Sequence, residues 1–132
     1  MSFGNELKAF AKKTGGKLED VAREVVINVG RSVVEKSPVR TGRFRANWQH
    51  GFGSPANGTL DDLDPSGGAS LVRIQSSTEG NPAAGIHFIS NNLPYAQRLE
   101  DGYSSQAPSG IVGLTAIEFR DIVNISVQKA KG

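Results

Sequence analysis

The stretch KLEDVAREVVINVGRSVVEKSP, residues 17–38, decides the fold because it carries the clearest helical pattern in the chain. Its apolar residues recur three or four positions apart, which places them along one stripe of a helix over residues 17–36 and predicts that this stripe faces a core. Pro38 has no amide hydrogen to donate, so the helix is expected to end before it. The stripe consists of Leu18, Val21, Ala22, Val25, Val29 and Val33.

A second long helical pattern lies near the C-terminal end, over residues 112–130. Ile122 and Ile125 fall off its main stripe, so the helix is expected to be apolar on two sides, one for its own core and one for a neighbour. The β-branched run at 122–127 leaves a partial strand as the alternative. The main stripe consists of Val112, Ala116, Phe119, Val123, Val127 and Ala130.

Shorter elements are expected between these helices and before the first. A helix is predicted over residues 3–13 and one or two helical turns over 95–100. Asp64, followed by Pro65, is the expected cap of a further helix ending near Thr78.

Strands and loops complete the expected pattern. Alternating side chains predict strands over Trp48–Phe52 and over residues 85–90. Glycine-rich polar loops are expected over 53–68 and 102–110. Because no β-α-β order appears, we expect a single α+β domain over residues 1–132, with a small antiparallel sheet packed against long N-terminal and C-terminal helices.

Residues that could carry chemistry are few. The chain has no cysteine, which excludes disulfides, thiolate zinc sites and a cysteine nucleophile. His50 and His87 are far apart in sequence, and no further ligand stands at a metal-binding spacing from either. The acidic run at 61–64 lacks the pattern of a calcium loop. We therefore expect no enzyme activity, metal or cofactor.

Charge is unevenly distributed. Residues 1–45 contain ten basic and five acidic residues, a net +5, whereas residues 46–132 contain five and eight, a net −3. Oppositely charged parts allow one copy to meet another head to tail; the alternative is that these charges lie on solvated helix faces. The absence of a long basic run argues against nucleic-acid binding. The N-terminus lacks an apolar signal core and no apolar run reaches membrane-spanning length, so a soluble, intracellular product is expected.

Two segments resemble the tail-component and tail-completion proteins of long-tailed bacteriophages: SPVRTGRFRANW at residues 37–48 and NNLPYAQRLEDGYSSQAPSGIV at residues 91–112. In that family a helix ends in a PVDTG-R-LR-S/A-W turn, and a later segment reads N-N-PYA--LE-G-S-QAP-G-V. The second segment is the more specific. The chain departs from the family at Val39-Arg40, where an acidic residue often precedes Thr-Gly, so a contact made by that acid is lost or reversed here.

The resemblance implies a structural virion protein, made in the cytoplasm of the bacterial host. It would form a closed ring of identical copies, six in number, in the neck or at the top of the tail, completing the tail and joining it to the head. Implied partners are the tail tube or tail terminator protein and the head connector or adaptor proteins. Genomic DNA would pass through the lumen without specific binding, and no membrane is involved.

Alternatives to this role are a head–tail adaptor on the portal side and, less favoured, a small DNA-binding or regulatory domain using the basic first 45 residues. The resemblance also implies contacts with other subunits, although the same motifs could instead close turns of the chain's own fold. The implied contact residues are Arg40, Thr41, Gly42, Arg43, Arg45, Asn92, Pro94, Tyr95, Arg98, Glu100, Gln106, Ala107 and Pro108.

Overall fold

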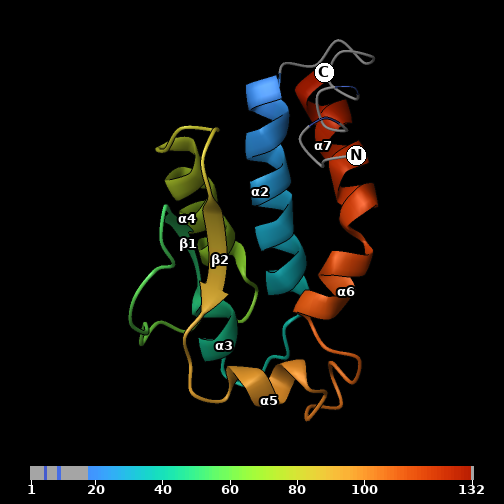
Figure 1. The fold of residues 1–132 in the computed structure, drawn as a ribbon. Helices are drawn as coiled ribbons and strands as arrows, with labels where there is room; N and C mark the ends of the chain where they lie inside the picture. The colour runs from blue at the N-terminus through green and yellow to red at the C-terminus, as the bar shows by residue number, and fades with distance from the viewer. Residues whose placement is uncertain (1–4, 6–8, 10–17, 132) are drawn as a thin grey trace.

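Two long antiparallel helices form one side of the molecule (Figure 1). The structure is a computed structural model that describes residues 5, 9 and 18–131, so the helix expected over 3–13 falls almost wholly outside the described residues. Helix α2 (Leu18–Lys36) lies beside α7 (Phe119–Lys131). Valines at helical spacing fill the space between them, as the predicted stripes require: Val21, Val25, Val123 and Val127.

The opposite side of α2 is also buried, which a single stripe did not predict. It packs against α4 (Gly68–Glu79) and the sheet. Gly30 allows the close approach of these two helices, because a Cβ there would lie 2.9 Å from Cγ2 of Ile74. The main core lies on this side and consists of Val33, Val34, Phe44, Trp48, Ile74, Leu93, Ala107 and Ile111.

The sheet has two antiparallel strands, β1 (Trp48–Phe52) and β2 (His87–Asn91). Strand β1 is the predicted one. Strand β2 begins two residues later and ends one residue later than the predicted 85–90, and its register pairs His87 with Phe52 and Asn91 with Trp48. With helices packed around this small sheet, the α+β prediction is confirmed.

The predicted helix over 112–130 is two helices, α6 (Val112–Ile117) and α7, separated by Glu118. The break rotates the buried face, so Thr115 is buried in α6 whereas Val112, on the predicted stripe, is 49% exposed. Ile125 is also exposed. The alternative of a strand over 122–127 is wrong, because these residues are helical.

Two short helices complete the fold: α3 (Arg43–Ala46) and α5 (Ala96–Glu100), the latter confirming the turns predicted over 95–100. Helix α4 begins at Gly68 and not at Pro65 as predicted. Asp64 still serves the first turn, since its carboxylate accepts hydrogen bonds from the backbone and hydroxyl of Ser70. No helix in the described part of the chain is long and apolar enough to cross a membrane.

Candidate functional site

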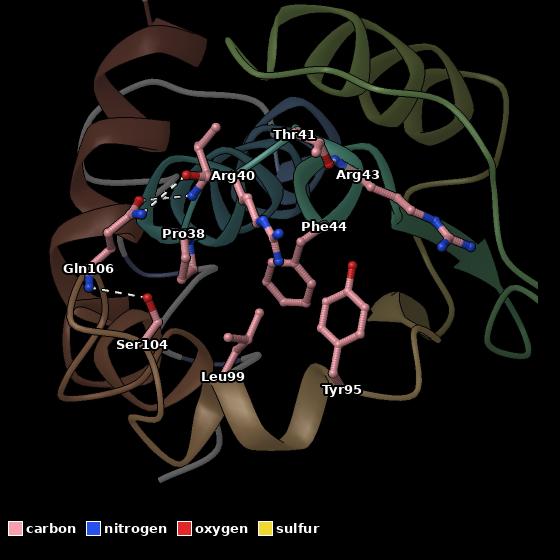
Figure 2. A pocket seen from close by; sticks show the side chains of 11 residues that line it. Pro38, Arg40, Thr41, Arg43, Phe44, Tyr95, Leu99, Ser104 and Gln106 are labelled. Atoms are coloured by element: carbon pink, nitrogen blue, oxygen red, sulfur yellow. Dashed lines mark hydrogen bonds between the residues drawn. The ribbon is translucent and has the colours of Figure 1, made fainter.

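The two segments that carry the family resemblance meet around one open pocket of about 670 Å³ (Figure 2). Residues 38–44 form one wall, and Tyr95, α5 and the loop that follows α5 form the other. More than fifty positions separate Phe44 from Leu99, so the pocket exists only in the folded chain. Its lining residues are Pro38, Val39, Arg40, Thr41, Gly42, Arg43, Phe44, Tyr95, Leu99, Ser104 and Gln106.

The floor of the pocket is apolar. Figure 2 shows the side chains of Phe44, Tyr95 and Leu99 converging on its centre. Phe44 is anchored in the core by an edge-on contact with Trp48, with ring centroids 5.7 Å apart. The Tyr95 ring lies 6.1 Å from that of Phe44 and stays 38% exposed. An apolar side chain entering here would therefore meet preformed aromatic and aliphatic surface.

The rim of the pocket is cationic. Its lining includes Arg40 and Arg43 and no acidic residue. Arg40 reaches over the pocket, whereas Arg43 points away from it (Figure 2). None of the three ion pairs in the described part of the chain involves Arg40. Arg43 has only a 3.7 Å contact with the fully exposed Asp61, so both guanidinium groups are available to an external carboxylate.

Thr41 and Gly42 shape the wall from within the chain. The Thr41 hydroxyl accepts the Arg43 backbone N–H at 3.3 Å, as expected for this turn. Gly42 has φ +90°, and its carbonyl accepts the backbone N–H groups of Ala46 and Asp64, both at 3.0 Å. A Cβ on Gly42 would lie 2.3 Å from the Pro65 nitrogen. Glycine is therefore required where two chain segments cross.

Gln106 joins the loop after α5 to the opposite wall. Its side chain accepts the Val39 N–H at 2.9 Å and donates to the Val39 carbonyl at 3.1 Å. Ala107 beside it is buried in the main core. Gln106 thus holds the two walls together, while Ala107 anchors the loop.

Other implied contact residues bind groups of their own chain. Arg45 donates to three backbone carbonyls, those of Glu35, Ser37 and Pro65. Asn92 donates to two carbonyls of the loop after β1. These two side chains therefore hold loops in place.

The remaining implied contact residues lie in helix α5 or around it: Pro94, Arg98, Glu100 and Pro108. The Glu100 carboxylate accepts the three backbone N–H groups at the start of α6, at 2.8–3.1 Å. The Arg98 guanidinium lies 5.5 Å from the ring centre of Tyr103. Pro94 and Pro108 are exposed. Arg98 is exposed as well, so these three side chains are open to a partner whereas the Glu100 carboxylate is used within the chain.

The Asp64 carboxyl is a buried charge next to the pocket wall. Burial raises its pKa, but hydrogen bonds from Ser70 and from the N–H groups of Gly67 and Ala69 outweigh that effect and hold the pKa below its usual value. The fold therefore stabilises the charged form of the Asp64 carboxyl at the start of α4.

A histidine pair that sequence spacing did not suggest lies across the sheet. His50 Nε2 is 2.8 Å from His87 Nδ1, and His50 Nδ1 is 2.7 Å from the Ser77 hydroxyl. His87 Nε2 must carry a hydrogen because it faces the Pro82 and Ala83 carbonyls. One hydrogen lies between His50 Nε2 and His87 Nδ1, so a single hydrogen bond joins the two rings, and His50 Nδ1 is hydrogen-bonded to the Ser77 hydroxyl.

The fold favours the uncharged form of His50. Burial, and next the nearby His87, lower the pKa of His50. Among the described residues, no three histidine, aspartate or glutamate side chains cluster in a way that could hold a metal ion.

Comparisons with family models, curated proteins and solved structures gave no match for this chain.

Proposed function

We propose that the chain is a structural virion protein of a long-tailed bacteriophage, forming a ring in the neck or at the top of the tail that completes the tail and joins it to the head. One observation carries this proposal. The two segments that resemble tail-completion proteins, separated by more than forty residues, converge on one pocket. A binding surface shared by both segments gives a physical reason for their occurring together.

The chemistry of the pocket supports a role in protein contacts. Aromatic residues and arginine are enriched where protein interfaces are buried, since they combine apolar area with directional hydrogen bonds. Phe44 and Tyr95 supply the apolar area, and Arg40 supplies the charge. Further copies, the tail tube or tail terminator and the head connector are the proposed partners, and DNA would cross the ring lumen without specific contacts.

The test is deletion of the gene in the phage or prophage that encodes the chain. We expect electron micrographs of lysates to show separate heads and tails, and the wild-type gene supplied in trans to restore joined particles. Arg40→Glu should restore few, whereas Arg120→Glu, which alters an exposed arginine on α7, should restore them normally. Normally joined, infectious particles from the deletion strain would refute the proposal.

The same lysates distinguish the head–tail adaptor alternative. Heads and tails from a mutant that is blocked in their joining are separated on a gradient. An antibody then locates the protein in the fractions. Tail completion predicts that it sediments with tails, whereas an adaptor on the portal side would sediment with heads.

A further inference from the structure

Residues 61–63 form a short, exposed acidic segment near the pocket. Asp61, Asp62 and Leu63 are all exposed, and Leu63 retains 62% of its surface in contact with solvent. Two exposed carboxylates thus precede a large apolar side chain that is open to water, and burial of that side chain against a partner would be favourable. The segment therefore combines negative charge with an exposed apolar side chain, and an apolar pocket with a cationic rim is complementary to it.

Both ends of this segment are held by buried groups. On one side, Asn47 accepts the Leu60 N–H at 2.7 Å and donates to the Leu60 carbonyl at 2.9 Å. On the other side, Asp64 is buried and bound to Ser70, and its N–H donates to the Gly42 carbonyl. Because the chain is fixed at both ends, little conformational entropy remains to be lost when the segment binds.

The pocket supplies the complementary surface. Its floor of Phe44, Tyr95 and Leu99 is apolar, and Arg40 on its rim lacks an acidic partner among the described residues. Asp61, the first residue of the segment, lies 3.7 Å from Arg43 of its own chain. The hydrogen bonds at Leu60 and Asp64 nevertheless keep Leu63 exposed, and Leu63 does not line the pocket of its own chain.

We infer that the segment 61–63 of one copy docks into the pocket of a second copy. Leu63 enters the apolar floor, and Asp62 pairs with Arg40 at the rim. Because the segment and the pocket are different surfaces, each copy can give one contact and receive another, which lets the interaction repeat around a closed ring. The inference rests on the proposed function only for the expectation that the assembly is a ring.

The test is a charge exchange measured by sedimentation velocity on the full chain over a range of concentrations. The wild type should associate. Arg40→Glu and Asp62→Lys should each weaken association by about tenfold or more, because each places like charges at the contact. An equimolar mixture of the two variants should associate again, since the unchanged Asp62 meets the unchanged Arg40, and the introduced lysine meets the introduced glutamate.

A second pair of variants tests the apolar part of the contact. Leu63→Ser should weaken association, whereas Val72→Ser, on α4 and 65% exposed, should leave it unchanged. Circular dichroism melting curves verify that each variant is folded. A wild type that stays monomeric at every concentration, or a mixture that fails to recover association, would overturn the inference.

The outcome is separable from that of the proposed function. If the chain is monomeric but phage still require it to join heads to tails, the inferred contact is refuted and the proposed function stands. If the chain self-associates through this contact but its loss leaves heads and tails joined, the contact stands and the proposed function is refuted.

Discussion

Replacing Gly42 with alanine adds one methyl group where the pocket wall crosses residues 64–65. The backbone there has φ +90°, and the new Cβ would lie 2.3 Å from the Pro65 nitrogen and 2.6 Å from the Asp64 carbonyl carbon. Both contacts are with backbone, and the bonds between Asp64 and Ser70 hold that backbone in place. The crossing therefore cannot relax by rotating a side chain.

The expected cost has three parts. Left-handed backbone at a residue with a Cβ costs about 1–2 kcal/mol, and the lower entropy of unfolded alanine offsets about 0.4–1 kcal/mol of this. Overpacking adds about 1–3 kcal/mol. The free energy of unfolding should thus fall by roughly 1–5 kcal/mol, a large part of the stability of a domain this size.

Gly58→Ala is the matched control. Gly58 has φ +77° but nothing within 4 Å of an added Cβ, so this variant has the backbone strain without the clash. Urea unfolding of both variants, followed by circular dichroism, should show Gly42→Ala less stable than Gly58→Ala by about 1–3 kcal/mol. Equal stabilities, within about 0.5 kcal/mol, would refute the claim that the close crossing at Gly42 is what demands glycine.

Three further perturbations test other parts of the fold. Trp48→Ala should cost about 3–5 kcal/mol, because the ring is 5% exposed and its Nε1 donates to the Ser37 hydroxyl at 2.7 Å; an unchanged urea midpoint would contradict its burial. Glu100→Ala should cost about 1.5–3 kcal/mol by removing the acceptor for three N–H groups of α6, and a wild-type melting temperature would count against that role. Since the pKa of His50 is lowered from 6.5, the unfolded chain binds the proton first, so the free energy of unfolding should fall as pH drops from 7 through 6.5 and below. His50→Gln should flatten this dependence, and an equally steep slope in that variant would assign it to other groups.

Local periodicity was sufficient for the main elements. Helix α2 and the valines of α7 follow from apolar residues three and four positions apart, and β1 from alternation. These patterns depend on neighbours along the chain, so they can be read without knowledge of distant contacts. The α+β class follows from the same elements and their order.

The extent of the elements was less predictable where tertiary contacts compete with pattern. The valines and isoleucines at 112–130 suggested one helix, but the chain turns at Glu118, and Lys36 of α2 binds that residue at 2.6 Å. Likewise α2 buries a second side around Gly30, because α4 packs there. Local composition cannot reveal that a second layer will cover a face.

Some roles of the site residues also follow from the local sequence, whereas others depend on the folded chain. The motif at 37–48 marked the region of the pocket, and Thr41 and Gly42 behave as their types suggest. Three features required the folded chain: the capture of Glu100 by the backbone of α6, the histidine pair, and the pocket itself. Each joins groups that are distant along the chain, often with a backbone atom as one partner. Backbone atoms are the same at every residue, so only the path of the chain through space decides which side chain meets them.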